Sequence, residues 1–273
     1  MQKTPIHITQ WGQNGPRVLM VHGSAQGSSV GGDGHFATQR ALGDQGWTIL
    51  VPDRPGHGKT PAADHPDDAQ LDGKWVADML GDASAGGAHL VGHSFGGCVA
   101  LAAAAMRPTA VRSLTLIEPG MQKLATDKSS VRQFGMKLLL VKYLSFTAAA
   151  RATRFAKLVG IPPEIGRGKS QQELTRMGQG IARLRVPSRE TLYAQLTTIR
   201  QAGIPLLVVT GGWCPAFEET ADVVAATGGG RRLVIASPHH FPQQVSQEFN
   251  NELAKFMSAH DNERSHAAAE RVD

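Results

Sequence analysis

The chain has 273 residues, 41% hydrophobic and 19% charged, so it can bury a core and is not an intrinsically disordered protein. Two cysteines exclude a disulfide-stapled scaffold and a four-cysteine zinc site, and 5% aromatic residues argue against a base-stacking nucleic-acid surface. We find no apolar run of signal-peptide length and none near the ~20 residues of a membrane span. We therefore expect a cytoplasmic protein with neither a membrane nor a nucleic acid as partner.

Short apolar runs alternate with segments of helical spacing along the chain. Buried parallel strands are predicted at residues 18–21, 48–51, 89–91, 114–117, 206–209 and 233–235. Helical spacing is found near residues 75–80, 99–105, 131–144, 147–159, 217–224 and 249–256. This alternation predicts an α/β fold with a doubly wound, mostly parallel sheet.

The alternation stops between residues 119 and 200, where helical patterns are separated by Gly and Pro. We predict a core domain of residues 1–118 and 201–273, with a helical lid insertion at 119–200. The insertion carries 15 of the 28 Lys and Arg residues but four acids, so its net charge is +11 and that of the remainder −6. This basic segment either attracts anionic substrates or an acidic partner, or forms solvated helix faces. The polar tail from residue 261 is expected to fray.

The strongest chemical signal is the Gly-His-Ser-Phe-Gly sequence of residues 92–96. It has G-x-S-x-G spacing, follows a predicted strand and opens an alanine-rich helix. Such a turn exposes the hydroxyl of its serine, here Ser94, on a strained backbone, and the glycines allow close backbone approach. The amide of Phe95, at the start of the helix, is then well placed to stabilise an oxyanion.

A His-Gly turn at residues 22–23 follows the first predicted buried strand. The amide of Ser24, or alternatively that of Ala25, is predicted to be the second oxyanion donor beside Phe95. His22 is interpreted mainly as a residue that hydrogen-bonds this turn.

These motifs together resemble the α/β-hydrolase superfamily over almost the whole chain. The matching pieces are residues 22–23, 52–58, 92–97, 118–119, 205–215 and 240–242. The resemblance implies a core sheet with a lid inserted after the family's sixth strand. It also implies that residues 53–58 form an architectural turn, without a catalytic role for Asp53, Arg54 or His57.

A serine nucleophile needs a histidine base and an acid that orients it. In this superfamily the base follows the last strand, where His240 precedes Phe-Pro and His239 is interpreted as a bystander. The acid usually follows the strand at 206–209, but Cys214 occupies that position. Some branches place the acid after the preceding core strand. Glu118 lies there, 24 residues after Ser94, as in the zearalenone-type lactonases that this layout resembles; Glu218 and Glu219 are alternatives.

The resemblance therefore implies a serine hydrolase that cleaves a carboxylic ester or lactone with Ser94, His240 and Glu118, without a cofactor or metal. The expected partner is a small-molecule substrate, which the basic lid would allow to be anionic. Expected substrate contacts are His22, Ala25, Phe134, Tyr143 and Trp213. A cofactor-free ring-opening dioxygenase, a carbon–carbon bond hydrolase and a non-catalytic small-molecule binding protein remain alternatives.

Overall fold

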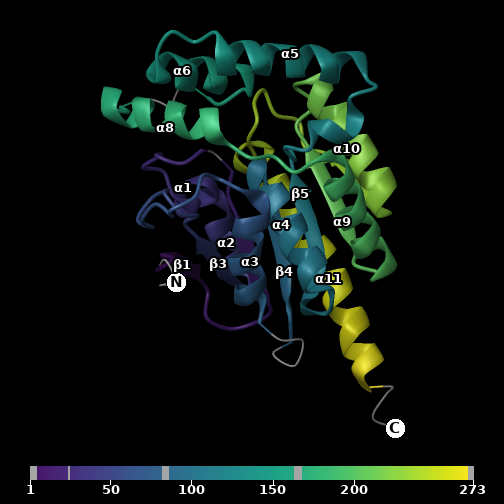
Figure 1. Ribbon diagram of the computed structural model, residues 1–273. Helices are drawn as coiled ribbons and strands as arrows, with labels where there is room; N and C mark the ends of the chain where they lie inside the picture. Colours follow the sequence, from purple (N-terminus) through teal and green to yellow (C-terminus); the bar gives the residue numbers. More distant parts are fainter. Residues whose placement is uncertain (1–4, 24, 82–85, 163–167, 270–273) are drawn as a thin grey trace.

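The computed structural model describes residues 5–23, 25–81, 86–162 and 168–269, with side chains of the last helix described as far as Asp261. A seven-stranded sheet in the order β1-β3-β2-β4-β5-β6-β7 forms the centre of the protein (Figure 1). Its strands are β1 (Ile8–Trp11), β2 (Arg17–Val21), β3 (Thr48–Pro52), β4 (Ala88–His93), β5 (Val111–Ile117), β6 (Leu206–Thr210) and β7 (Arg231–Val234). β1 runs antiparallel to β3, and the other neighbouring pairs are parallel. The predicted α/β class and mostly parallel sheet are confirmed.

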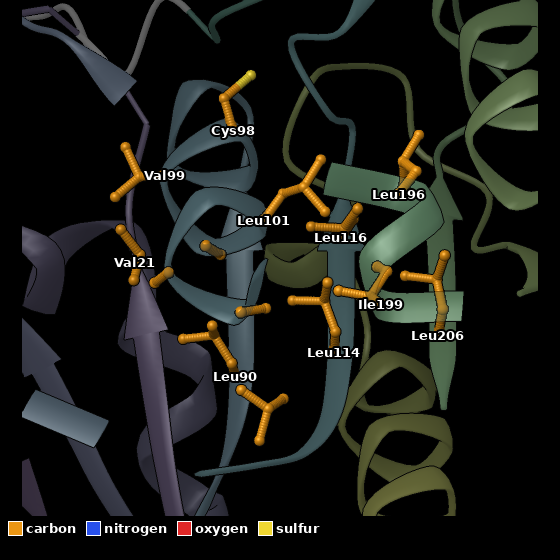
Figure 2. Close-up of a cluster of buried hydrophobic side chains, with 14 of the residues drawn as sticks. Val21, Leu90, Cys98, Val99, Leu101, Leu114, Leu116, Leu196, Ile199 and Leu206 are labelled. Atoms are coloured by element: carbon orange, nitrogen blue, oxygen red, sulfur yellow. The ribbon is translucent and has the colours of Figure 1, made fainter. Parts of the chain in front are cut away.

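Helices cover both faces of the sheet, as the doubly wound prediction requires. One face packs against α3 (Ala69–Leu80), α4 (Phe95–Met106), α9 (Arg189–Gln201) and α10 (Pro215–Gly228). Figure 2 shows part of this core, where leucines of β5 lie between α4 and α9. The opposite face packs against α2 (Arg40–Gly43) and α11 (Gln247–Ala269). A short helix, α1 (Gly32–His35), precedes α2.

The chain between β5 and β6 forms α5 (Ser129–Tyr143), α6 (Ala148–Leu158), α8 (Gln171–Arg183) and α9. The first three pack together at one end of the molecule (Figure 1). α9 instead lies along the core, because Leu192, Leu196 and Ile199 belong to the main buried cluster. Single 3₁₀ turns lie at Ala37–Gln39, Pro108–Ala110, Gln122–Ala125 and Pro242–Gln244.

Besides the position of α9, two features differ from the sequence-based expectations. β1 was not among the predicted strands, because its residues alternate between exposed and half-buried at the sheet edge and form no continuous apolar run. The expectation of a frayed tail from residue 261 is not met as far as Ala269, where α11 ends, and the Asp261 carboxylate accepts hydrogen bonds from His89 and Arg112. Residues 270–273 lie outside the described residues. Within the described residues, no helix is both long and apolar enough to cross a bilayer.

Candidate active site

Ser94 lies in the tight turn between β4 and α4. Its backbone has φ 56° and ψ −123°, a conformation that is costly for a residue with a Cβ and brings the side chain out of the sheet. The two motif glycines are required sterically. A Cβ on Gly96 would lie 2.2 Å from the carbonyl oxygen of Val21, and one on Gly92 would lie 2.6 Å from that of Gly96. The amide of Ser94 donates to the carbonyl of Ile117 at 2.9 Å, which anchors the turn to β5.

His240 follows β7 and contacts Ser94 directly. Its Nε2 lies 2.8 Å from Ser94 Oγ, and its ring is almost fully buried. The backbone on both sides is fixed, because the His240 amide donates to the carbonyl of Gly160 at 3.0 Å and its carbonyl accepts from His93 Nε2 at 2.8 Å. Because Nδ1 of the same ring donates to the Glu118 carboxylate, Nε2 is left as the acceptor for the Ser94 hydroxyl.

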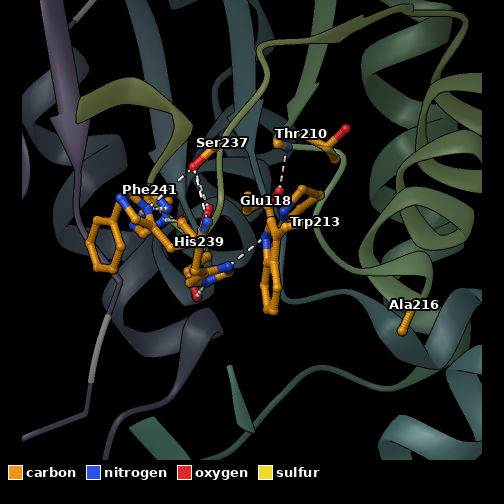
Figure 3. A network of polar contacts seen from close by, with 12 residues as sticks. Glu118, Thr210, Trp213, Ala216, Ser237, His239 and Phe241 are labelled. Carbon is orange, nitrogen blue, oxygen red and sulfur yellow. Dashed lines mark hydrogen bonds and ion pairs between the residues drawn. The ribbon is translucent and has the colours of Figure 1, made fainter. Parts of the chain in front are cut away.

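Glu118 follows β5 and completes the line of side chains. Its Oε2 accepts from His240 Nδ1 at 3.1 Å and from Trp213 Nε1 at 3.0 Å, while Oε1 accepts from the amide of Gly211 at 2.7 Å (Figure 3). The side chain is fully buried. Three donors satisfy a carboxylate whose burial would otherwise be costly. The structure thus brings Ser94, His240 and Glu118 into one hydrogen-bonded chain.

The alternative acids point elsewhere. Glu218 accepts from Thr210 Oγ1 and Arg232, both at 2.7 Å, and Glu219 accepts from the Ser130 hydroxyl. Cys214 precedes α10, and burial raises the pKa of its thiol, which keeps it protonated at neutral pH. Glu118 is therefore the carboxylate that contacts His240 in this structure.

His239, the neighbour of the candidate base, is held within its own turn. Its Nδ1 accepts from the amide of Phe241 at 3.2 Å, and its carbonyl accepts from Ser237 Oγ at 2.7 Å (Figure 3). These contacts shape the loop that presents His240.

Phe95, one of the predicted oxyanion donors, directly follows Ser94 in the chain. Phe95 is the first residue of α4, so its amide has no carbonyl partner within that helix. Ser24 lies outside the described residues, and Ala25, the alternative donor, lines the cavity at Ser94. Gly23 approaches closely, since a Cβ there would lie 2.7 Å from Ser94 Cβ.

A buried arginine, Arg54, contacts both Gly23 and Phe95. The Arg54 guanidinium is paired with Asp67 and Asp72, donates to the Gly23 carbonyl at 3.4 Å and stacks 4.6 Å from the centre of the Phe95 ring. Asp67 also accepts from the amide of Gln26 at 2.7 Å. One ionic cluster therefore holds the backbone of Gly23 and of Gln26 and contacts Phe95, the first residue of α4. Sequence reasoning gave Arg54 an architectural part only, and its full burial was not visible from the sequence.

His22 lies beside this ionic cluster and does not line the cavity at Ser94. Its Nδ1 donates to the Gly23 carbonyl at 2.7 Å, and its Nε2 accepts from the amide of Arg54 at 2.9 Å. Burial lowers its pKa well below the ordinary value, so the ring is neutral at physiological pH. His22, predicted as a substrate contact, is not among the wall residues of the cavity at Ser94.

A cavity of about 90 Å³ lies at Ser94 and His240, and its wall is mostly apolar. Of the predicted substrate contacts, Ala25 and Phe134 line it. Tyr143 does not: it is 69% exposed on α5. Trp213 is likewise absent from this wall and instead donates to Glu118. Wall residues that sequence reasoning did not select include Phe217 and Phe241, although Phe241 directly follows the candidate base.

A larger cavity of about 580 Å³ adjoins the first, and the two share His35, Ile161 and Phe241 as wall residues. Its wall is apolar apart from a few groups, among them Lys157 and Lys169. Lys169 is paired with Glu173 at 3.1 Å. Among the residues that the structure describes, no group of His, Cys, Asp and Glu side chains is arranged to hold a metal ion.

Comparison with known proteins places this site in a family context. The family profile described as alpha/beta hydrolase fold matches residues 16–156, just over half of the chain. The chain is 34% identical over 151 residues to lipase LipV of Mycobacterium tuberculosis, covering 55% of this chain and 54% of the relative. It is 31% identical over 116 residues to the 2-hydroxy-6-oxo-6-phenylhexa-2,4-dienoate hydrolase of Burkholderia cepacia, covering 42% and 40%. The matches span about half or less of the length of these relatives.

The fold extends beyond these aligned segments. A putative lipase of Acinetobacter baumannii superposes with a TM-score of 0.69 at 19% identity, covering 93% of this chain and 89% of that one. At this identity the likeness concerns the fold alone. The profile match over just over half of the chain leads to one conclusion: the chain belongs to the α/β-hydrolase family.

Proposed function

We propose that the chain is a serine hydrolase that cleaves a carboxylic ester or lactone through Ser94, His240 and Glu118. The observation that carries the proposal is the position of His240, 2.8 Å from Ser94 Oγ on one nitrogen and 3.1 Å from Glu118 Oε2 on the other. These distances suit proton transfer from a nucleophile to a base that a carboxylate orients. The name of the M. tuberculosis lipase is in keeping with this chemistry.

In the proposed reaction, His240 Nε2 takes the proton of Ser94 Oγ as this oxygen attacks the substrate carbonyl carbon. The resulting oxyanion accepts from the amide of Phe95 and from a second amide in the loop that contains Ser24 and Ala25. The carbon–oxygen bond then breaks, and the leaving alcohol takes the proton from His240. Water attacks the acyl-enzyme, gives a proton to His240, and releases the acid while Ser94 Oγ recovers its proton. Glu118 stabilises the imidazolium formed in both steps.

The two adjoining cavities support a medium-sized substrate with a large apolar part. We propose that α5, α6 and α8 of the 119–200 insertion act as its lid, since Phe134 of α5 and Phe155 of α6 line the cavity at Ser94.

Lys157, exposed at the wall of the larger cavity, would favour a carboxylate on the apolar part of the substrate. Raising the salt concentration should then lower kcat/KM for a carboxylate-bearing ester and leave that of a neutral ester unchanged. Equal salt responses would remove the anionic preference.

A panel of p-nitrophenyl esters of increasing chain length, together with lactones, tests the proposal. We expect turnover to fall by about three orders of magnitude or more in Ser94→Ala, because the covalent path is lost. A fluorophosphonate should label the wild-type chain at Ser94 and should not label this variant. Turnover near the wild-type rate in Ser94→Ala would contradict acyl transfer at this residue, and absence of labelling would favour the binding-protein alternative.

A carbon–carbon bond hydrolase is the second candidate. The name of the B. cepacia relative, which is similar to this chain over 116 residues, favours it. A 2-hydroxy-6-oxo-2,4-dienoate, the type of compound in the name of that relative, should be added to the ester panel. Turnover of that compound without turnover of any ester or lactone would make it the preferred assignment.

A further inference from the structure

Helix α5 has apolar side chains on two opposite faces. One face carries Val131, Phe134, Leu138 and Val141, which recur at helical spacing and are buried or half-buried. α5 packs against α10, and Phe134 and Leu138 line the cavity at Ser94. This face accounts for the attachment of α5 to the rest of the protein.

The other face of α5 is also apolar, but it is exposed. Its side chains are spaced by three and four residues and continue into the turn that follows the helix. This docking face consists of Met136, Leu139, Leu140, Tyr143, Leu144 and Phe146. Phe146 is completely exposed, at 102% of its reference area, and the others are at least 42% exposed. More than half of the exposed large hydrophobic side chains in the described residues belong to this one face. A contiguous apolar patch of this kind marks an interaction surface.

The turn that presents Leu144 and Phe146 is well anchored. Arg154 of α6 donates to the carbonyl of Leu144 at 2.8 Å, and Arg151 donates to that of Lys142 at 3.0 Å. The hydroxyl of Ser145 donates to the carbonyl of Val141 at 2.6 Å. The exposed side chains therefore project from a backbone held by α6.

Charge indicates what covers this face. Residues 128–162 contain seven Lys and Arg residues and no Asp or Glu. Lys142 lies beside the face, with its Nζ 5.7 Å from the centre of the Tyr143 ring, and Lys137 is exposed on the same helix. A second copy of the chain docked by two-fold symmetry would bring these cations against one another. An apolar surface bordered by lysines instead suits lipid headgroups of negative charge.

We propose that the docking face of α5 binds an anionic lipid surface. Figure 1 shows α5 and α6 at the outer end of the molecule, where a flat surface can reach them. Because the opposite side of α5 lines the cavity at Ser94, the lipid would lie about one helix diameter, ~10 Å, from that cavity. This inference departs from the sequence-based expectation of no membrane partner and does not depend on the proposed reaction.

Co-sedimentation with lipid vesicles tests the proposal. The Ser94→Ala chain is mixed with vesicles of phosphatidylcholine alone or of an equal mixture with phosphatidylglycerol. We expect binding about tenfold or more tighter to the anionic vesicles, weakened by high salt. Leu144→Ser/Phe146→Ser should lower this binding about tenfold or more, and so should Lys137→Glu/Lys142→Glu.

Met106→Ser is the matched control, since Met106 is an exposed apolar side chain at the C-terminal end of α4. It should bind vesicles as the parent does. The same substitutions in a chain that retains Ser94 should leave hydrolysis of the soluble p-nitrophenyl acetate unchanged, which shows that the fold is intact.

Failure of the parent to bind anionic vesicles would overturn the proposal, as would equal binding by every variant. A concentration-dependent dimer that Leu144→Ser/Phe146→Ser dissociates, without vesicle binding, would assign the face to contacts between copies of the chain. Vesicle binding by a chain that hydrolyses neither an ester nor a lactone would remove the hydrolase proposal and leave this one intact.

Discussion

At the scale of single residues, the candidate site depends on two strained positions. Ser94 and Glu118 are the non-glycine residues with positive φ in the described part of the chain, at 56° and 45°. Each follows the carboxyl end of a strand, β4 and β5, and these strands are hydrogen-bonded neighbours. Main-chain hydrogen bonds hold both residues, from Ser94 to Ile117 and from Glu118 to Val209. Strain of this kind persists where surrounding contacts fix it, and here it directs two side chains toward His240.

Substitution of Glu118 tests its assignment as the acid. Glu118→Gln keeps the size of the side chain but removes the charge that would balance the His240 imidazolium. We expect kcat to fall by about 10²–10⁴, as for the amide substitution of a triad carboxylate. Steady-state kinetics on a p-nitrophenyl ester measures this loss. Cys214→Ala should cost far less. Near wild-type activity in Glu118→Gln combined with loss in Glu218→Gln or Glu219→Gln would move the acid to the loop after β6.

The ionic cluster behind the oxyanion loop supplies a second prediction. Asp67 and Asp72 are both buried and both pair with Arg54, but Asp67 alone of these two also accepts from the Gln26 amide. Asp67→Asn should therefore loosen the loop at residues 23–26 and lower kcat about tenfold or more, with little change in KM. Asp72→Asn is the matched control, with a similar loss of stability, on the order of 3 kcal/mol, but a smaller loss of kcat. Equal effects of the two variants on kcat would mean that the cluster acts through stability alone.

At the scale of secondary-structure elements, the sequence predicts those strands and helices that have a local pattern of apolar residues. Strands β2 to β6 are short apolar runs because both faces of a parallel sheet are buried, whereas β1, at the edge, has no such run. The spacing of apolar residues predicts a helix but not the part of the protein against which the helix packs. For this reason α9 was grouped with the lid, although its Leu196 lies in the main core.

The same limit applies to the site. Ser94 and His240 stand in local motifs, and Glu118 was predicted from the resemblance to branches that place the acid after the preceding core strand. The direction of Tyr143 depends on the rotation of α5 about its axis, which two opposite apolar faces leave open. The brace by Arg54 joins residues far apart in the chain and has no local signature.

The wall that α6 contributes to the larger cavity can be tested through chain-length preference. Ala156 lies on this wall, and Ala156→Trp would fill part of the space of about 580 Å³. We expect kcat/KM for octanoate esters to fall about tenfold or more relative to acetate esters, because a long acyl chain then loses its apolar contacts. Leu139→Trp, on the exposed face of α5, is the control of equal bulk and should leave the preference unchanged. An unaltered preference in Ala156→Trp would place the acyl chain elsewhere.

At the scale of the whole molecule, buried histidines connect the core to the site. His57, His22, His35 and His93 follow one another, with ring centroids 4.9, 5.0 and 6.2 Å apart, and the His93 ring lies 4.8 Å from that of His240. Burial lowers the pKa of all four, to about 3 for His35 and His57 and well below the ordinary value for His22 and His93. The folded protein thus keeps a row of neutral imidazoles.

These histidines predict a loss of stability in mild acid. In the unfolded chain they titrate near pH 6.5, whereas in the folded chain they remain neutral to much lower pH, so below about pH 6.5 the unfolded state binds more protons. Their contribution is complete above that pH and is lost as the pH falls from about 6.5 toward 3, on the order of 1 kcal/mol per histidine per pH unit. Urea unfolding between about pH 7.5 and pH 5.5 measures the slope. His57→Asn should make it shallower by about one proton. A free energy of unfolding that stays constant across this range, or a wild-type slope in His57→Asn, would contradict the neutral burial of these rings.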